Sequence, residues 1–194
     1  MLKYQHRGCF DVKYLDVEII SLERKGAAVT DAVDLITAAW NAQRPDVDVS
    51  PMAVCARITR LSNVLDREFK DFFGAYGLEF WEFDVLATLL RCGSPDGLTA
   101  GALNKAAMRT SGAITNRIDK LTAKGLVERV PDATDRRSIR VRLTATGREL
   151  VDTLLPLHVA NEERILAGLV TGDRDELAGL LRKLAESLGD TSLA

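Results

Sequence analysis

The residue types best suited to chemistry in this 194-residue chain are cationic, and they concentrate in one segment. Between Lys105 and Arg148 the net charge is +7, whereas the rest of the chain carries −9. Eleven basic side chains produce this excess: Lys105, Arg109, Arg117, Lys120, Lys124, Arg129, Arg136, Arg137, Arg140, Arg142 and Arg148. A basic face on an acidic body is the electrostatic signature of a phosphate-binding surface. We therefore expect a nucleic-acid-binding surface, although the whole chain has a net charge of −2.

Residues 111–124 have the composition of a helix that can enter a DNA major groove. The small side chains at its start permit close approach to the double helix. The hydroxyl of Thr115 and the amide of Asn116 can read base edges, and the ammonium of Lys120 can meet a phosphate. An ordinary amphipathic helix with a solvated polar face would also carry such residues. The surrounding positive charge favours the DNA-reading interpretation.

Two short segments with alternating apolar residues, 126–130 and 139–143, predict a β-hairpin directly after this helix. The polar turn between them carries Asp135, Arg136 and Arg137. An arginine at the tip of a two-stranded ribbon can enter the minor groove, and Asp135 can pair with an arginine and fix the shape of the ribbon. A solvated charge run in a turn is the alternative. The hairpin is interpreted as the wing of a helix-turn-helix.

We expect the DNA contacts to come from the helix-turn-helix and the wing. The residues are Arg109, Thr110, Ser111, Ala113, Thr115, Asn116, Lys120, Arg136, Arg137 and Ser138. A winged-helix module that binds a protein instead of DNA is the rival class, and the basic segment argues against it.

The elements that must position these residues are mainly helices, because apolar residues recur with a helical period along most of the chain. Ser50 is expected to cap a helix that runs to about residue 74, and Thr99 is expected to cap a short helix over residues 100–107. Thr144 is expected to start a helix that runs to about residue 170, and Thr171 to cap the last. The predicted fold is mostly α with a small β-hairpin wing, comprising a winged helix-turn-helix lobe and N- and C-terminal dimerisation helices. The expected segments are an N-terminal extension that is either helical or disordered (1–29), N-terminal helices for dimerisation and scaffold (30–75), the DNA-binding lobe (76–148) and C-terminal dimerisation helices (149–194).

Other function classes find little support in the sequence. Histidine occurs only at His6 and His158, and there is no Ser/His/Asp set, phosphate-binding GxxxxGK loop or metal-ligand cluster. We therefore expect neither an enzyme nor a bound metal or cofactor. No apolar run approaches the roughly 18 residues that span a bilayer, and charges interrupt the N-terminal segment. A cytoplasmic protein without membrane association is expected.

The three cysteines, Cys9, Cys55 and Cys92, are odd in number and far apart in the sequence. This spacing speaks against a zinc site. Two interpretations stay open: ordinary buried or half-buried thiols, or one redox-sensing cysteine.

The segment from Ser111 to Arg129 and the wing sequence DRRSIRVRLTATG, residues 135–147, closely resemble the MarR family of winged-helix repressors. The resemblance covers roughly residues 30–188. It implies a homodimer whose N- and C-terminal helices interlock, with one winged lobe in each subunit. It also implies double-stranded DNA as a partner.

A narrower resemblance lies in the segments WNAQRPDVDVSP (40–51) and FWEFDVLATLL (80–90), which are similar to the urate-responsive, HucR/PecS-like branch of the family. This resemblance implies a ligand site formed by Trp40, Asp84, Arg117 and Arg129. In that branch the arginines and the tryptophan hold a planar anion, whose charge repels the aspartate and shifts the recognition helix.

The chemistry of these four residues suits such a ligand, since two guanidinium groups can bind a planar, oxygen-rich anion with paired hydrogen bonds. Each residue also has an ordinary explanation. Trp40 could be interface core, Asp84 and Arg117 a simple ion pair between helices, and Arg129 a phosphate contact. Urate or a related purine anion is the expected effector of a repressor, and citrate, aconitate, another small carboxylate or a phenolic ligand is the alternative.

Overall fold

The computed structural model describes residues 30–107, 114–132, 135 and 138–192. The predicted extension 1–29 lies outside the described residues. Contacts between residues divide the chain into two compact units, residues 1–66 and 67–194.

The first unit contains α2 (Ala32–Gln43) and the N-terminal part of α3 (Ser50–Gly74). Asp31 caps α2, because its carboxylate accepts hydrogen bonds from the backbone N–H groups of Val33 and Asp34 at 2.8 and 2.9 Å. Arg57 of α3 joins the two helices by binding Asp31 at 2.8 Å and Asp34 at 2.6 Å. The backbone hydrogen bond from Asp34, followed by the side-chain bond from Arg57, lowers the pKa of Asp31 below its ordinary value.

The start of α3 differs from the sequence prediction, in which Ser50 was the cap. Ser50 is instead the first helical residue. The capping bond comes from Asp48, two residues before the helix, whose carboxylate accepts hydrogen bonds from the backbone N–H of Ser50 at 2.9 Å and from its hydroxyl at 3.1 Å. These two bonds lower the pKa of Asp48. Ser50 does not act as the cap, because it is itself helical and its hydroxyl donates to Asp48.

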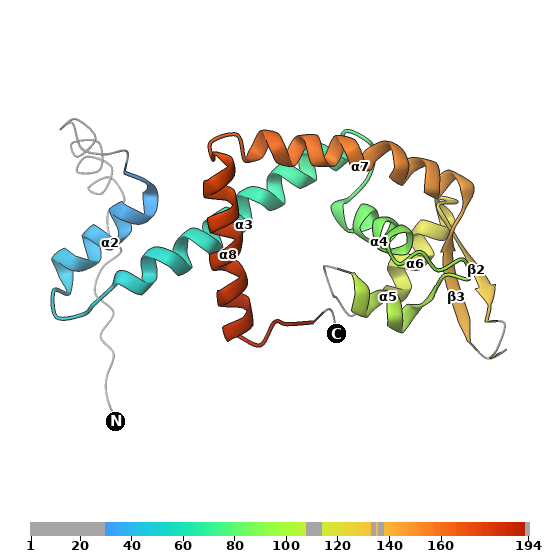
Figure 1. Cartoon of the computed structure of the whole chain (residues 1–194), viewed down its shortest axis with the longest axis horizontal. Coiled ribbons are helices and arrows are strands. Elements are labelled where there is room, and N and C mark those ends of the chain that lie inside the picture. Colours follow the sequence, from blue (N-terminus) through green and yellow to red (C-terminus); the bar gives the residue numbers. More distant parts are fainter. Residues whose placement is uncertain (1–29, 108–113, 133–134, 136–137, 193–194) are drawn as a thin grey trace, which may run out of the picture. The chain divides into compact units, whose positions relative to one another are not determined.

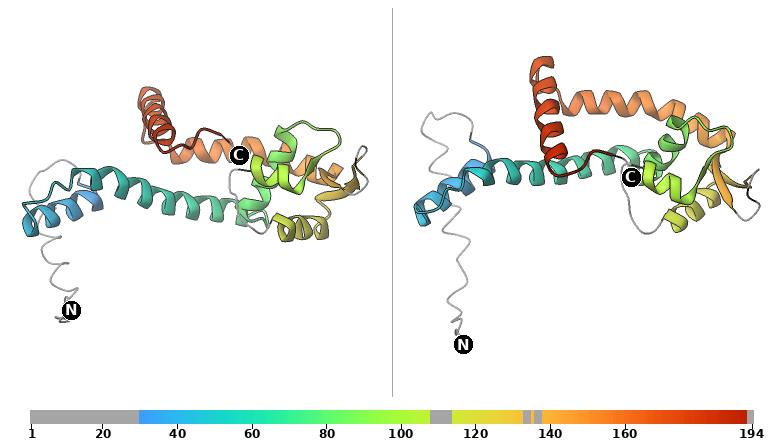
Figure 2. Two further views of the ribbon diagram at one scale, coloured as in Figure 1. Left: turned by 90° about the horizontal axis from the view of Figure 1, so that it is seen from below. Right: turned by 60° about the horizontal axis from the view of Figure 1, so that its bottom comes forward.

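The described part of the second unit contains a small sheet and six helical segments, of which the first is the end of α3. The remaining elements are α4 (Phe80–Arg91), β1 (Leu98–Thr99), α5 (Ala100–Ala106), α6 (Ile114–Ala123), β2 (Val127–Pro131), β3 (Ile139–Leu143), α7 (Ala145–Ile165) and α8 (Thr171–Ser187). Figures 1 and 2 show α4, α5 and α6 gathered together, with the β2–β3 hairpin projecting from their edge. The predicted fold class, mostly helical with a small wing, is confirmed.

The sheet is antiparallel with strand order β1-β3-β2. Val141 of β3 pairs with Arg129 of β2 on one side and with Leu98 of β1 on the other. The strand at 139–143 was predicted with the observed bounds, and β2 lies one residue later than predicted. The two-residue strand β1 was not predicted, because it is too short to show alternation.

The core of the second unit lies between α4, α5, α6 and α7 and includes Leu86, Leu103, Leu121 and Leu154, all almost fully buried. Beside this core, the ring of His158 packs against phenylalanine rings, with the centroid of Phe73 at 5.1 Å. Burial of these side chains removes apolar surface from water and holds α6 on the lobe.

Two glycines fix the connection between α6, the hairpin and α7. Gly125 follows α6 with φ +69°, and the backbone N–H of Leu126 then reaches back to the carbonyl of Leu121 at 3.0 Å. Gly147, in the first turn of α7, lies so close to the strand start that a Cβ there would sit 1.9 Å from the Leu126 oxygen. Only glycine is compatible with this approach.

The C-terminal helices end and begin at different residues from those predicted. The helix expected to run from Thr144 to about residue 170 ends at Ile165, and Thr171 is the first residue of α8 and not its cap. Arg174 of α8 stabilises the turn between the two helices, because its guanidinium binds the carbonyls of Leu166 and Leu169 at 3.1 and 3.0 Å. The Leu166 carbonyl also accepts from the backbone N–H of Leu169 at 2.9 Å.

Apolar side chains on the terminal helices are exposed. No residue of α8 is buried, and its leucines Leu177, Leu180, Leu181 and Leu184 are each more than a third exposed. In the first unit, Ile36 and Trp40 on α2 are similarly exposed. Among the described residues, no helix is both long and apolar enough to cross a membrane.

Candidate nucleic-acid interface and effector site

The helix α6 has one buried face and one exposed face. Ile118 and Leu121 are buried against the core, whereas Thr115, Asn116 and Lys120 are exposed. The helix α5 precedes it and is capped by Thr99, whose hydroxyl accepts from the Ala102 N–H at 3.2 Å, as predicted. The three residues expected to contact DNA on α6 are therefore accessible to a partner. Four others expected there, Arg109, Thr110, Ser111 and Ala113, lie outside the described residues.

The base of the wing is held by a buried ion pair between Arg140 and Asp132. The Asp132 side chain is only 6% exposed, and Arg140 also donates to the Gly97 carbonyl at 3.0 Å. The Asp132 carboxylate accepts a further hydrogen bond, from the backbone N–H of Asp135 at 3.2 Å. The predicted pairing of Asp135 with an arginine stays a prediction. Sequence reasoning missed Asp132, because its pairing with Arg140 depends on the strand register.

The turn between β2 and β3 is described only in part. Ser138 is half-buried, and its carbonyl accepts from the Asp132 N–H at 3.0 Å. The expected DNA contacts Arg136 and Arg137 lie outside the described residues.

Trp81 on α4 is a contact of α6 that sequence reasoning did not identify. The guanidinium carbon of Arg117 lies 5.2 Å from the centre of the indole ring, and the Lys120 ammonium lies 5.9 Å from it. Both distances allow a cation–π attraction. An aromatic residue at the start of α4 thus faces two cations of α6, a pairing that only the packing of these helices could reveal.

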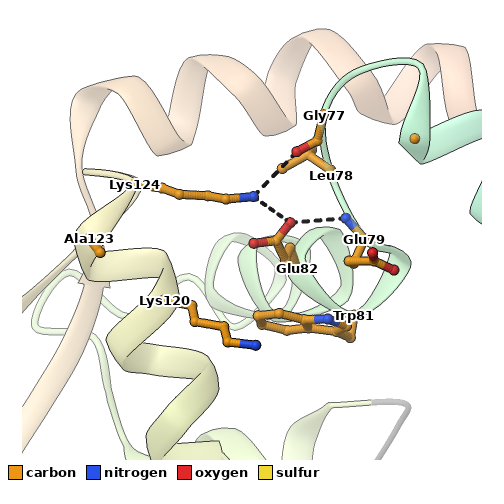
Figure 3. A pocket seen from close by; sticks show the side chains of 9 residues that line it. Gly77, Leu78, Glu79, Trp81, Glu82, Lys120, Ala123 and Lys124 are labelled. Atoms are coloured by element: carbon orange, nitrogen blue, oxygen red, sulfur yellow. Dashed lines mark hydrogen bonds and ion pairs between the residues drawn. The ribbon is translucent and has the colours of Figure 1, made fainter.

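A second missed contact is the ion pair between Glu82 of α4 and Lys124, just after α6 (Figure 3). The two charged atoms are 2.7 Å apart, and the Glu82 side chain is only 3% exposed. Glu82 also accepts from the Glu79 N–H at 2.9 Å, while the Lys124 ammonium donates to the Gly77 carbonyl at 3.3 Å. The pair therefore fastens the end of α6 to the segment between α3 and α4.

Arg129 of β2 binds Asp119 of α6, with 2.6 Å between the charged atoms. Both side chains are substantially exposed, so the pair by itself contributes little to stability. Its position matters more than its strength, because it joins the first strand of the wing to α6. The sequence analysis considered Arg129 as a ligand or phosphate contact and did not consider this pair.

A hollow of about 730 Å³ opens between the end of α3, the start of α4 and the C-terminal half of α6. Figure 3 shows its side chains, with Lys120 extending from α6 toward the indole of Trp81. Its lining consists of Gly74, Gly77, Leu78, Glu79, Trp81, Glu82, Lys120, Ala123 and Lys124. None of the four residues expected to bind the effector belongs to this lining.

The four residues expected to bind the effector are divided between the two units. Trp40 is on α2 in the first unit and is 47% exposed, whereas the other three lie in the second unit. Asp84 is buried on α4, Arg117 is half-buried on α6, and Arg129 is exposed on β2. The grouping of all four in one pocket stays a prediction. No cluster of metal-binding side chains occurs in the described part of the chain.

Comparison with known proteins identifies the family. A model of the MarR family matches residues 76–138. The HTH-type transcriptional regulator PecS of Dickeya dadantii (strain 3937) is 36% identical over 149 residues, which cover 77% of this chain and 90% of that protein. The chain belongs to the MarR family. As a MarR-family protein it is a DNA-binding helix-turn-helix transcription regulator, and its relatives are regulators rather than enzymes.

Two solved MarR-type structures agree with this assignment. One is Bordetella bronchiseptica BpsR, whose DNA binding is regulated by 6-hydroxynicotinic acid; its TM-score is 0.61 at 25% identity over 68% of this chain and 92% of that chain. The other is a mutant of MarR from E. coli in complex with operator DNA, with a TM-score of 0.60 at 24% identity. It covers 75% of this chain and 96% of that chain and shares the fold.

Proposed function

We propose that this MarR-family regulator is a cytoplasmic homodimeric repressor that binds a near-palindromic operator and releases it when a small planar anion binds. Urate or a related purine anion is the preferred effector. The proposal is supported by the resemblance of Trp40, Asp84, Arg117 and Arg129 to the urate-responsive branch and by the similarity to PecS.

The observation that carries the proposal is the attachment of α6 to its neighbours through groups that an anion would attract. Arg117 contacts Trp81 of α4, and Asp119 binds Arg129 of β2. An anion that draws the two guanidinium groups toward itself must change these contacts. Because α6 carries the exposed Thr115 and Asn116, its DNA-reading face would move with them.

A ligand can shift the equilibrium between the form of the protein that binds DNA and the form that releases it only if it binds these two forms with different affinity. A coupling of about 1–3 kcal/mol between effector and DNA is typical of such systems. The buried carboxylate of Asp84 supplies an opposing charge on α4, which would attract an arginine in the empty protein and repel an incoming anion.

The dimer is proposed from the exposed apolar side chains of α2 and α8, since large exposed apolar patches mark interaction sites. A two-fold dimer would present two copies of α6 to successive major grooves roughly 34 Å apart. The operator would then consist of two similar half-sites in inverted orientation.

The test is titration of a preformed protein–DNA complex with urate. We expect release in the parent protein and loss of release in Trp40→Phe and Arg129→Ala, which leave the residues of α6 unchanged, although Arg129→Ala also removes the ion pair with Asp119. Release that persists in both variants would place the effector site elsewhere. An absence of release with urate, citrate and aconitate would mean that the four residues have only a structural role.

Two alternatives have a specific observation in their favour. BpsR responds to 6-hydroxynicotinic acid, another planar heteroaromatic acid, so this compound belongs in the same titration. Cys55 and Cys92 are both exposed, which is compatible with redox sensing. Release of DNA by peroxide that is reversed by a thiol reductant would favour the redox alternative.

A further inference from the structure

We propose that two apolar side chains of the wing, Pro131 and Ile139, pack against deoxyribose rings of bound DNA. The contact would lie on the backbone strand that separates the major groove, which α6 enters, from the minor groove, which the tip of the wing enters. It differs in kind from the expected base and phosphate contacts, because it is apolar. The inference rests on the proposed function, in which α6 and the wing bind an operator.

Pro131 and Ile139 face each other across the β2–β3 hairpin, near the end that projects from the helices (Figure 1). Side chains alternate between the two faces of a strand, so Ile139 shares its face with Val141. Val141 is 2% exposed and belongs to the core, whereas Ile139 is 48% exposed and Pro131 is also exposed. The core-facing side of the sheet therefore continues outward as an exposed apolar surface.

This face of the hairpin points toward α6. Arg129 lies on it, two residues before Pro131, and its guanidinium binds Asp119 of α6 at 2.6 Å. The same helix carries the exposed Thr115 and Asn116, which are expected to read base edges. A surface that looks from an element in the minor groove toward an element in the major groove meets the sugar–phosphate strand between them.

The surroundings of the apolar pair fit DNA better than another protein surface. Arg129 shares its face, and the turn between the two strands carries Arg136 and Arg137 in the sequence. Deoxyribose offers C–H groups flanked by phosphates, which complements apolar side chains flanked by cations. β2 is an edge strand, and Pro131 lacks the backbone N–H that pairing with a further strand requires.

An apolar contact and a phosphate contact differ in how they depend on salt. A cationic side chain that neutralises a phosphate releases counterions, so the logarithm of the affinity falls with the logarithm of the salt concentration. Burial of an apolar side chain releases no counterions. Loss of the Ile139 side chain should therefore weaken DNA binding and leave the salt slope unchanged.

The test uses the full-length protein and a labelled DNA fragment that the parent protein selects from a random pool. Fluorescence anisotropy at several salt concentrations gives the affinity and its salt slope. Ile139→Thr keeps a β-branched residue suited to a strand. It should bind about fivefold more weakly than the parent, with the same slope. Val130→Thr, on the opposite face of β2, is the matched control and should stay within about twofold of the parent affinity.

A positive charge at the same position gives a second measurement. In Ile139→Lys the new ammonium would reach the phosphates beside the sugar, so the salt slope should steepen by about 2 for a dimer with one such contact in each subunit. A damaged wing would not produce this gain. Urea unfolding should show the same midpoint in the parent and in all three variants, because both positions lie outside the core.

Parental affinity in Ile139→Thr, or a parental salt slope in Ile139→Lys, would overturn the contact. Equal weakening in Ile139→Thr and Val130→Thr would assign the effect to the whole hairpin and would overturn it too. A smaller mass of Ile139→Thr in light scattering would instead assign the pair to a contact between copies of the chain. These outcomes leave operator binding in place, whereas failure of the parent protein to select any DNA would contradict the proposed function and this inference with it.

Discussion

At the scale of single residues, the ion pairs of this protein differ in how much stability should be lost when one partner is removed. Glu82 and Asp132 are buried carboxylates that pair with Lys124 and Arg140, whereas the carboxylates of Glu128 and Asp119 are exposed in their ion pairs. A buried charge that loses its partner cannot regain solvation without local rearrangement. The buried pairs are therefore the sites where substitution should matter.

Replacing Lys124 by Ala should lower the free energy of unfolding by about 1–2 kcal/mol, because it leaves the Glu82 carboxylate buried without its cation. The value lies below that of a fully buried pair, since Lys124 itself is 43% exposed. Urea unfolding monitored by circular dichroism measures the change. Lys120→Ala is the control, with an expected change under about 0.5 kcal/mol. Equal effects of the two substitutions would contradict the anchoring role of the Glu82–Lys124 pair.

Two arginines of β3, Arg140 and Arg142, allow a second pair of matched substitutions. Arg140→Ala should destabilise the protein by about 2 kcal/mol, because Asp132 would lose its guanidinium in a buried place. Arg142→Ala, whose partner Glu128 is exposed, should cost less than about 0.5 kcal/mol. Thermal and urea unfolding report both values. A larger loss in Arg142→Ala than in Arg140→Ala would show that the wing base is held in another way.

At the scale of helices and strands, the acidic caps are expected to make the first unit sensitive to acid. The pKa of Asp31 is lowered in the folded protein, mainly by the backbone hydrogen bond from Asp34. The unfolded group titrates near 3.8, so the cap is complete above that pH and is lost as the pH falls through the lower folded pKa.

The amide proton shifts of Val33 and Asp34 should therefore titrate together with a midpoint below 3.8, because both N–H groups bind the Asp31 carboxylate. Nuclear magnetic resonance between about pH 5 and about pH 2 follows them. Asp31→Ser retains a capping oxygen without an ionisable group, and this variant should show no such titration. A midpoint above 3.8 in the parent protein would contradict the predicted direction.

Local signals in the sequence predicted most of these elements and missed the contacts between them. The Thr99 cap and the strand 139–143 are confirmed because their determinants lie within a few residues. The cap at Asp48 was missed because Ser50 and Pro51 offer a competing local signal. The turn before α8 is stabilised by Arg174 reaching back across it, which no periodicity reveals.

In the candidate site, too, the sequence predicted local features and missed the contacts between elements. Sequence reasoning found the cations of α6, since charge is visible in composition. It missed Trp81, Glu82 and the Asp119–Arg129 pair, because these contacts require knowledge of which helix face meets which neighbour. The proposed grouping of Trp40 with Asp84 rests on resemblance, since the two residues lie in different units.

At the scale of the whole molecule, dimerisation should depend on the exposed leucines of α8. Replacing Leu180 and Leu184 together by Glu should convert the proposed dimer into a monomer, because charges would enter an apolar contact. Light scattering coupled to size-exclusion chromatography measures the mass. Lys183→Ala on the same helix is the control and should remain dimeric. Dimers in the double variant would place the subunit interface elsewhere.

Deletion of residues 174–194 extends this test to DNA. We expect the shortened protein to be insoluble or monomeric and to lose operator binding, since two linked half-sites are needed for affinity. Gel-shift measurements on the full chain provide the reference. A shortened protein that still dimerises and binds DNA would contradict the role assigned to the C-terminal helix.

The close approach at Gly147 has a mechanical consequence. The Thr144 hydroxyl binds the Gly125 carbonyl at 2.7 Å, and the Thr144 N–H binds the Leu126 carbonyl at 3.2 Å, so the first turn of α7 is fastened to the junction of α6 and β2. No side chain at residue 147 could act as a spacer there. We expect a rotation of α7 to move the wing and the end of α6 with it, because these three elements are joined at this junction.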